Sequence, residues 1–342
     1  VIARLGRTTA VLVHKSFLMN QWIERIHDCF DISDDDIGFV QQDRCEFIDK
    51  KIVVIMVQSL LARDYPKSLY EYFGTVVVDE CYSEDTEILT EVGWVAFPEL
   101  QKSTRVAQYH SDGKIDFVKP VRHIVREYEG DMIHVKARQV DLMLTPGHMQ
   151  TYKKTNDAEV KKERIEDMKF YYGKQVPMAG FAESGRGLTA EERFLIALQA
   201  DGYIVPETHS NGRYCGYSEV QMSFKKQRKI DRIREILKDC GYAWSENKTS
   251  RGRLRFIVQV PVSVKLTKYF DEWVELSNVN SVWGDEFIQE VVNWDGHRQA
   301  EYPERLYYSS KDSRNVDVIQ AVAALSGYTC TRMLQVDNRE PQ

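Results

Sequence analysis

The stretch VVVDECYSEDT, from Val76 to Thr86, divides the chain into two parts of different character. Its first half is a run of valines that ends in an acidic pair, Asp79 and Glu80. Such a run predicts a buried strand, and carboxylates at the end of a parallel strand are well placed to hold Mg²⁺ beside a nucleotide. The second half opens with Cys81 and continues in polar residues, so a different texture begins there.

The residues before this stretch predict an α/β domain. TAVLVH (Thr9–His14), KIVVIMV (Lys51–Val57) and TVVVDE (Thr75–Glu80) are apolar runs of strand length. Residues 15–30, between the first two runs, carry apolar side chains at helical spacing. Strands that alternate with helices indicate a parallel sheet.

The residues after it predict a mostly β domain, which extends from Cys81 to about Met178. Short alternating runs and turns predominate, and Ser111-Asp112-Gly113 between two such runs predicts a hairpin. A linker with Gly and Ser follows, from Pro177 to Gly187. This change of texture marks a second domain boundary.

Helices return beyond the linker. Thr189 with Glu192 three residues later predicts a capping box at the start of a helix. A similar helix is expected to begin near Asp285. The two helices end in Ala-Asp-Gly at Asp201 and Trp-Asp-Gly at Asp295, which indicates a weak internal duplication.

Composition describes an ordinary globular chain of 342 residues, with 43% hydrophobic and 29% charged residues and a formal net charge of -6. No apolar run approaches the length that spans a bilayer, and no signal peptide is recognisable, so we expect no membrane partner. The six cysteines form no C-x-x-C pair, which predicts neither a disulfide framework nor a zinc site. Because the chain starts at Val1 and stops at Gln342 without a closing element, we expect a fragment cut at both ends.

The segments VLVHKSFLMNQW, IVVIMVQSL and YFGTVVVDEC resemble, in order and spacing, the first RecA-like domain of superfamily 2 DEAD/DEAH-type helicases, and phage-type DNA helicases most of all. The resemblance implies that Asp79 and Glu80 are the Walker B pair that binds ATP with Mg²⁺. It also places His14-Lys15 and Gln58-Ser59 on the DNA side. The Gly-rich phosphate loop and the second RecA-like domain are absent from this sequence.

A lone cysteine is more often a small core residue than a nucleophile. Here, however, CYSEDTEILTEVGWVAF resembles the N-terminal splicing block of inteins, which opens with Cys and carries Asp85-Thr86. VDLMLTPGHMQTY resembles the intein block with Thr145 and His148. Both blocks follow an interrupted helicase motif, which favours an insert over a core cysteine.

The resemblance implies an N-to-S acyl shift at the Glu80–Cys81 peptide bond. The thiol of Cys81 attacks the carbonyl of Glu80, because a thiol is nucleophilic and partly ionised near neutral pH. His148, with a pKa expected near neutrality, protonates the departing nitrogen, and Thr145 orients the peptide. Splicing needs no cofactor, but the C-terminal intein residues and the downstream nucleophile are missing partners.

FLIALQADGYI and FIQEVVNWDGHR resemble the two motifs of LAGLIDADG homing endonucleases, the usual insert of inteins. LYYSSKDSRNVDVIQAVAALSGY resembles the tail of that family's second half. The resemblance implies that Asp201 and Asp295 bind Mg²⁺ and cut double-stranded DNA.

Both motifs depart from the family pattern. Ile196 and Glu290 replace the small residues that let the two helices pack closely, so tight contact is less assured. No K-x-I-P-like segment precedes the second motif, and Lys311 is the candidate catalytic lysine. Taken alone, each motif is more often simply a helix with an acidic last residue, because the Ala-Asp-Gly signal is short.

Residues 224–255 hold eleven Lys/Arg against four Asp/Glu. Lys225 and Lys226 open this segment, and Arg251, Arg253 and Arg255 alternate along SRGRLRFIVQV, which fits a strand that lays arginines on DNA phosphates. A solvated helix with an edge strand is an equal alternative.

We therefore expect a multidomain chain: a partial α/β RecA-like N-extein (1–80), the N-terminal part of a mostly-β Hint (horseshoe-like) splicing domain (81–182) and a truncated α+β LAGLIDADG endonuclease (183–342). A cytoplasmic, phage-encoded origin fits this reading. Two other functions stay open. The chain is an ATP-dependent DNA helicase with a decayed, inert insert, which the Glu290 substitution favours, or a DNA-binding protein without catalysis.

Overall fold

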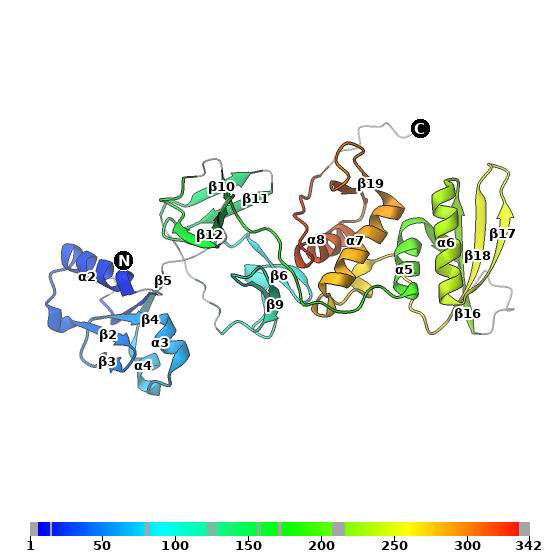
Figure 1. Cartoon of the computed structure of the whole chain (residues 1–342). Helices are drawn as coiled ribbons and strands as arrows, with labels where there is room; N and C mark the ends of the chain where they lie inside the picture. Colours follow the sequence, from blue (N-terminus) through cyan, green and yellow to red (C-terminus); the bar gives the residue numbers. More distant parts are fainter. Residues whose placement is uncertain are drawn as a thin grey trace.

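The computed structural model (Figure 1) describes every residue except 1–5, 14–15, 79–81, 122, 124, 126–127, 129, 138, 156, 158, 170–172, 207–215 and 335–342. Within that described part, no helix combines the length and the apolar character needed to cross a membrane. Mixed α/β structure is spread over several small sheets with their helices.

The N-terminal region is a five-stranded sheet in the order β3-β2-β4-β1-β5, parallel except for the edge strand β3. Its strands are β1 (Thr9–Val13), β2 (Ile37–Gln41), β3 (Arg44–Cys45), β4 (Ile52–Met56) and β5 (Thr75–Val78). Its helices are α2 (Ser16–Cys29), η1 (Asp34–Asp36), α3 (Val57–Ala62) and α4 (Lys67–Tyr72).

Both faces of this sheet are covered, which explains why its strands read as continuous apolar runs. Val11 and Val13 of β1 pack with Ile26 of α2 on one face. Ala10 of the same strand packs with Leu69 of α4 on the other. The parallel sheet predicted from the sequence is confirmed, although strand β4 ends at Met56 because Val57 already begins a helix.

The β region, defined here as residues 82–182, contains three small antiparallel sheets. The first has the order β7-β6-β8-β9 and is built from β6 (Glu87–Thr90), β7 (Gly93–Ala96), β8 (Val106–Tyr109) and β9 (Ile115–Val118), with η2 (Phe97–Glu99) after β7. The others are β10-β11 and β13-β12-β14, formed by β10 (Ile133–Ala137), β11 (Val140–Leu144), β12 (Met149–Lys154), β13 (Lys161–Arg164) and β14 (Lys174–Gln175).

The hairpin predicted at Ser111-Asp112-Gly113 is confirmed between β8 and β9. Gly113 has φ +88°, in the left-handed region that a side chain disfavours, and its N–H donates to the carbonyl of His110 at 3.0 Å. The Asp112 carboxylate accepts from the N–H of Lys114 at 3.0 Å.

The C-terminal region, residues 183–334, combines helices with a four-stranded sheet in the order β15-β16-β18-β17 and a two-stranded sheet, β19-β20. Its helices are α5 (Ala190–Asp201), α6 (Gln227–Cys240), η4 (Phe270–Glu272), η5 (Leu276–Asn278), α7 (Ser281–Asp295) and α8 (Ser313–Leu325). Its strands are β15 (Gly202–Ile204), β16 (Tyr217–Phe224), β17 (Ala243–Lys248), β18 (Leu254–Pro261), β19 (Gly296–Arg298) and β20 (Leu306–Tyr308).

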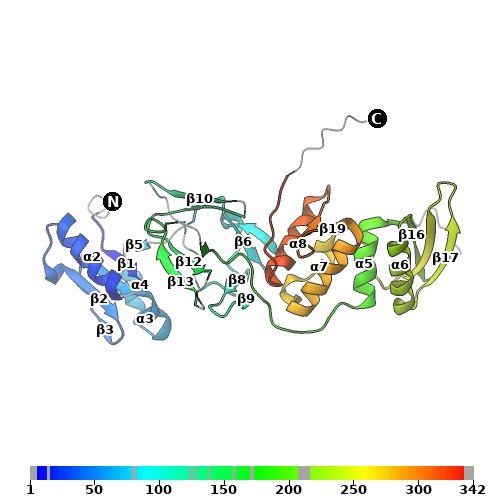
Figure 2. The ribbon, with the colours of Figure 1, turned by 45° about the horizontal axis from the view of Figure 1, so that its top comes forward.

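Helix α5 lies between α7 and α6 in both views (Figure 1 and Figure 2). The capping box predicted for α5 is confirmed, because the N–H of Glu192 donates to the Thr189 hydroxyl at 3.2 Å and the Glu192 carboxylate accepts from the N–H of Thr189. The second helix, expected to begin near Asp285, is present as α7 but starts four residues earlier. This helix begins at Ser281, since the side chain of Asn280 accepts from the N–H groups of Val282 and Trp283.

The hydrophobic core does not follow the boundary between the β region and the C-terminal region. Leu89 of β6 is 6% exposed and belongs to the apolar core of the C-terminal helices, with Trp94 and Phe117 packed against it. Strands β10 to β14 enclose a separate small cluster around Leu144 and Ile165. Sheet β6–β9 and the C-terminal helices therefore share one core.

The linker strengthens this connection. The carbonyl of Phe181 accepts from the N–H of Ile115 in β9 at 3.0 Å. On its other side, Gly180 donates to the carbonyl of Ala324 and Ala182 to that of Leu325, both in α8. The segment expected to be a plain linker thus pairs with both regions.

Candidate functional site

Two acidic residues meet at the ends of neighbouring helices. Asp201 is the last residue of α5 and Asp295 the last residue of α7. The ammonium of Lys229, in the first turn of α6, contacts the Asp201 carboxylate and lies 3.6 Å from Oδ1 of Asp295. One cation therefore serves both carboxylates, which places the two aspartates within reach of a single small ligand.

Each aspartate is followed by a glycine that begins a strand. A helix that ends in Asp-Gly predicts a left-handed glycine at its end. Gly202 and Gly296 are instead extended, with φ of -87° and -116°, and lead directly into β15 and β19. A Cβ on Gly296 would lie 2.5 Å from the carbonyl of Tyr307, and one on Gly202 would lie 2.8 Å from that of Leu198. Glycine is required at both positions because a backbone carbonyl lies too close to leave room for a Cβ.

The surroundings of Asp295 disfavour the charged form of its carboxyl. Burial raises the pKa of the Asp295 carboxyl, and the negative charge of Asp201 raises it further, whereas Lys229 and Lys268 oppose this. The two carboxylates thus repel each other and favour a bound positive charge.

A second lysine stands beside the pair. The Lys268 ammonium donates to the carbonyls of Leu198 at 2.7 Å and Gly202 at 2.8 Å, at the end of α5. Burial lowers the pKa of this ammonium, while the charges of Asp295 and Asp201 act in the opposite direction. Such an amine, half-buried beside carboxylates, is suited to proton transfer.

A phenol completes the surroundings of the acidic pair. Burial is the main cause that raises the pKa of Tyr308, and Asp295 contributes to it. The side-chain amide of Gln199 donates to its hydroxyl at 3.5 Å. Gln199 and Tyr308 therefore line the same place from the two halves of the C-terminal region.

Lys311, the lysine predicted from the sequence, is not part of this cluster. It is exposed, just ahead of α8, and the described ion pairs of Asp201 and Asp295 do not include it. The lysines that the structure places beside the two aspartates are Lys229 and Lys268. The basic composition of residues 224–255 includes Lys229, but no spacing in the sequence distinguishes it, and no motif marks Lys268.

The donor set fits Mg²⁺ with water as the remaining ligands. Among the residues that the structure describes, no group of three or more His, Cys, Asp or Glu could hold a metal ion. Mg²⁺ commonly takes only one or two carboxylates and keeps several waters. Asp201 and Asp295 already hold one positive charge between them, which is the chemistry such an ion needs.

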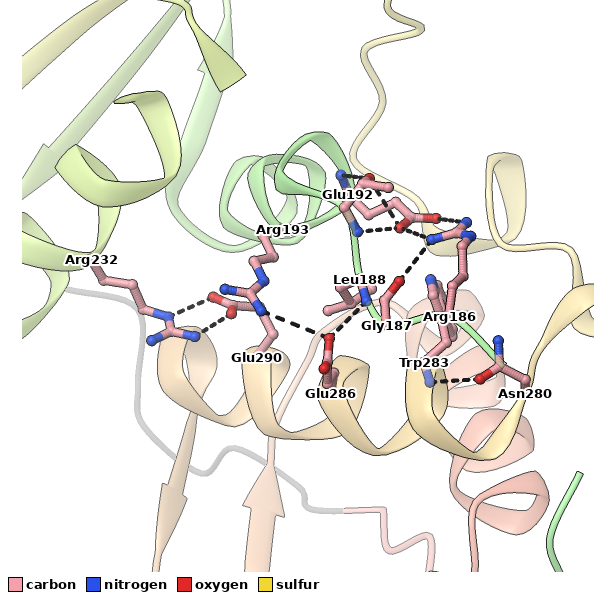
Figure 3. A network of polar contacts seen from close by, with 11 residues as sticks. Arg186, Gly187, Leu188, Glu192, Arg193, Arg232, Asn280, Trp283, Glu286 and Glu290 are labelled. Carbon is pink, nitrogen blue, oxygen red and sulfur yellow. Dashed lines mark hydrogen bonds and ion pairs between the residues drawn. The ribbon is translucent and has the colours of Figure 1, made fainter. Parts of the chain in front are cut away.

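The two large residues at the contact between α5 and α7 are buried, and Glu290 is paired there with Arg232. Ile196 is 1% exposed and Glu290 2% exposed. Figure 3 shows the Arg232 guanidinium facing both carboxylate oxygens of Glu290, with Nε 2.7 Å from Oε1. The indole of Trp294 donates to the same oxygen at 2.7 Å. Helix α7 therefore packs beside α5 in spite of the substitution that made close contact less assured.

A neighbouring carboxylate fixes the entry into α5 (Figure 3). Glu286 of α7 accepts from the N–H of Leu188 at 2.7 Å and lies 3.7 Å from Arg193 of α5. The start of α5 is thereby tied to α7, and its end carries Asp201.

The predicted DNA-contacting residues are not all on one strand. Arg251 and Arg253 lie in the turn between β17 and β18, so the expectation that three arginines alternate along a strand is wrong. Arg255 alone is on β18, exposed between Ser223 of β16 and Asn247 of β17. Lys225 and Lys226 are exposed between β16 and α6. Chain reversal at Gly252, with φ +67°, explains the difference.

Cys81, Asp79 and Glu80 lie outside the described residues, as do His14 and Lys15. Ser59, which together with Gln58 is also expected on the DNA side, is 6% exposed, and its hydroxyl accepts from the N–H of Gln42 at 2.9 Å.

The chain just after Cys81 runs beside the second predicted splicing block. Tyr82 forms an antiparallel bridge with Leu144, and the N–H of Ser83 donates to the carbonyl of Met143 at 3.0 Å. The Tyr82 ring meets the His148 ring edge-on, with centroids 4.5 Å apart. Residues 82–83 and the turn of Thr145 to His148 thus form one site.

His148 is buried, with 7% exposure. Its backbone N–H donates to the Thr145 carbonyl at 3.0 Å and closes a turn. Burial, helped by the charge of Lys162, lowers the pKa of its imidazole to about 4. The expectation of a pKa near neutrality is therefore wrong, because the charged form loses its hydration. Its Nδ1 has no hydrogen-bond partner among the described residues. Thr145 is also 7% exposed.

Comparison with known families identifies the N-terminal region. Residues 2–105 match the family described as "Type III restriction enzyme, res subunit", so the chain contains a helicase-type region. The parallel sheet β1–β5 is the fold expected of a RecA-like domain. The match continues beyond β5 into the first sheet of the β region.

Relatives with other names match between 28% and 72% of the chain. One is the ribonucleoside-diphosphate reductase subunit beta of Aquifex aeolicus (strain VF5), 34% identical over 72% of this chain and 40% of that protein. The DNA-directed RNA polymerase subunit beta C-terminal section of Stigeoclonium helveticum is 22% identical over 52% of this chain and 20% of that protein. The ATP-dependent Clp protease proteolytic subunit of Chlamydomonas moewusii is 29% identical over 28% of this chain and 10% of that protein. The chain spans 40% or less of each relative.

Proposed function

We propose that the chain is part of a helicase-type protein interrupted by a self-splicing insert, and that this insert carries a metal-dependent DNA endonuclease. The observation that carries the proposal is the meeting of Asp201 and Asp295 around Lys229, at the ends of two adjacent helices. Paired carboxylates of this kind hold divalent ions in enzymes that hydrolyse phosphodiesters.

In the proposed endonuclease, each aspartate belongs to one half of a duplicated unit and serves one DNA strand. Asp201 and Asp295 would hold Mg²⁺, which would neutralise charge at the scissile phosphate and activate water for the attack. Lys268 stands beside the pair with a lowered pKa, so it can take or return a proton during hydrolysis. Tyr308 and Gln199 restrict the space next to Asp295 and position water by hydrogen bonds.

The open face of the four-stranded sheet is the surface that would bind double-stranded DNA. Its apolar face, with Val220, Phe256 and Val258, is buried against the helices. The opposite face presents Gln221, Arg255 and Asn247, which are polar and suit contacts with base edges and phosphates. Lys225 and Lys226 add positive charge between β16 and α6, close to Lys229 in sequence.

The proposed splicing step starts at the Glu80–Cys81 bond. The Cys81 sulfur forms a bond to the Glu80 carbonyl carbon, the carbon–nitrogen bond breaks, and the nitrogen leaves as an amine that carries the thiol proton. At neutral pH His148 is uncharged, because its pKa is lowered to about 4. A neutral imidazole can accept the thiol proton and pass it to the nitrogen, and the unpartnered Nδ1 supports this role. The bridge between Tyr82 and Leu144 supports the location.

The relatives support an insert rather than a fixed domain. A reductase subunit, a protease subunit and a polymerase subunit bear unrelated names, and the reductase match covers 72% of this chain, whereas residues 1–80 make up less than a quarter of it. A segment shared by proteins of unrelated function is typical of a mobile element. In the intact host, Asp79 and Glu80 would bind ATP with Mg²⁺ once splicing rejoins the helicase-type domain.

A cleavage assay tests the endonuclease. The substrate is double-stranded DNA with the uninterrupted helicase gene sequence, incubated with Mg²⁺ and the full chain. We expect cutting that Asp201→Asn and Asp295→Asn each reduce at least about 100-fold. Lack of cutting by the unaltered chain would favour the alternative, a helicase with a decayed insert. DNA binding that survives both substitutions without any cutting would indicate a binding protein.

Hydroxylamine treatment tests the splicing step separately. We expect release of a fragment that ends at Glu80 from the unaltered chain, and none from Cys81→Ala. If fresh protein releases no such fragment, the acyl shift does not occur in this chain.

A further inference from the structure

Helices α6 and α8 begin at corresponding positions in the two halves of the C-terminal region. Gly202 pairs with Met222 in the first half, and Gly296 pairs with Tyr308 in the second. Helices α6 and α8 both start at the fifth residue after that partner, at Gln227 and Ser313. Lys229 and Asn315 therefore occupy equivalent positions, the third residue of each helix.

The two equivalent residues have different roles. Lys229 extends toward the acidic pair. Asn315 is 2% exposed, and its Oδ1 accepts from the N–H of Phe270 at 2.8 Å while its Nδ2 donates to the carbonyl of Lys268 at 3.1 Å. One buried amide thus binds the backbone on both sides of Tyr269, in the segment that presents Lys268.

The adjacent arginine secures the same segment further along. Arg314 donates to the Asp271 carboxylate at 2.9 Å and 3.0 Å, and its guanidinium lies 4.1 Å from the centre of the Tyr269 ring. These contacts are exposed at the surface and act on Tyr269 and Asp271, whereas Asn315 contacts the backbone of Lys268. In the first turn of α8, Arg314 therefore anchors the segment at the surface, whereas Asn315 positions Lys268.

We propose that Asn315 is a positioning residue for Lys268: by holding the Lys268 carbonyl and the Phe270 N–H, it directs the Lys268 ammonium to the Leu198 and Gly202 carbonyls beside Asp201 and Asp295. Its relevance to cleavage rests on the proposed endonuclease function. At this helix position the second half of the duplication therefore has the neutral amide of Asn315 in place of an ammonium. This amide positions the ammonium of Lys268, which lies in the preceding segment.

The test compares Asn315→Ala with Arg314→Gln in the full chain, using two readouts. The first is lysine labelling with acetic anhydride at neutral pH, read by mass spectrometry. In Asn315→Ala we expect Lys268 to react about tenfold faster than in the unaltered chain, with Lys229 unchanged. In Arg314→Gln, Lys268 should react at the unaltered rate. A merely structural effect of Asn315 would expose both lysines, and equal rates for Lys268 in all three proteins would overturn the proposal.

The second readout is DNA cleavage under single-turnover conditions. We expect Asn315→Ala to slow the cleavage step about tenfold and to leave DNA affinity unchanged. If the unaltered chain cuts no DNA, the endonuclease proposal fails while labelling still decides the role of Asn315. If Asn315→Ala does not fold, Asn315→Asp replaces it, because the aspartate keeps the acceptor for Phe270 and removes the donor to Lys268.

Discussion

The guanidinium of Arg232 on α6 binds both carboxylate oxygens of Glu290 on α7. Glu290 is 2% exposed and also accepts from Trp294 Nε1 at 2.7 Å. Burial of a carboxylate is costly, and here three hydrogen bonds from two side chains compensate for it. The substitution that argued for decay of this motif is therefore matched by a partner.

Loss of this partner should be costly. We expect Glu290→Ala to lower the free energy of unfolding by about 3 to 5 kcal/mol, because Arg232 would remain half-buried without its carboxylate. Urea unfolding followed by tryptophan fluorescence measures this change. The double variant Arg232→Met with Glu290→Leu should recover most of the loss. A cost below about 1 kcal/mol for Glu290→Ala would show that the pair contributes little to stability.

The lysines distinguish the structural site from the one predicted by sequence. We expect Lys268→Met to reduce DNA cleavage by about 100-fold or more, because it removes the amine beside the acidic pair. Lys311→Met, an equivalent change at an exposed position, should leave the rate within about threefold of the unaltered chain. Single-turnover cleavage rates measure both. The reverse ranking would restore Lys311 as the catalytic lysine.

The stability of the β region should depend on pH through His148. Its pKa is about 4 in the folded chain against 6.5 in the absence of the fold, so the unfolded state binds more protons between these values. Stability is therefore present above pH 6.5 and is lost as the pH falls toward 4, by an amount on the order of 3 kcal/mol. Urea unfolding at a series of pH values measures this dependence. It should be absent in His148→Ala and present in His134→Ala, which changes an exposed histidine.

Arg255 should act through DNA phosphates. We expect Arg255→Ala to weaken DNA binding several-fold and to reduce the slope of log affinity against log salt by about 1. Arg234→Ala is a matched control, because Arg234 has the same charge but pairs with Glu246. Fluorescence anisotropy with labelled duplex DNA at several salt concentrations gives both slopes. An equal effect of the two substitutions would contradict a specific role for the open sheet face.

Leu89 should stabilise helices that are distant from it in sequence. We expect Leu89→Ala to cost about 2 to 5 kcal/mol and to increase amide hydrogen exchange in α7 and α8. Leu144→Ala removes the same atoms from the separate cluster of strands β10–β14, so it should increase exchange there and not in the helices. Unchanged exchange in α7 and α8 for Leu89→Ala would mean that the shared core is not cooperative.

Local structure was predictable wherever a few neighbouring residues decide it. The Thr189–Glu192 capping box, the turn at Gly113 and the apolar runs of β1 and β4 follow from side-chain chemistry within one or two turns of chain. The start of α7 differs from the prediction because Asn280, a good N-cap, lies five residues ahead of Asp285. The strand of arginines was misplaced because the turn at Gly252 falls inside it.

The sequence by itself determined the positions of Asp201 and Asp295 at helix ends, the parallel character of the N-terminal sheet and the change of texture at Cys81. Only the tertiary structure decided which lysines stand beside the aspartates, since Lys229 and Lys268 come from segments far apart in the chain. The tertiary structure also decided the burial of His148 and with it the lowered pKa of its imidazole. Hydrogen bonds and burial between distant segments set these properties, and sequence spacing carries no record of which segments come together.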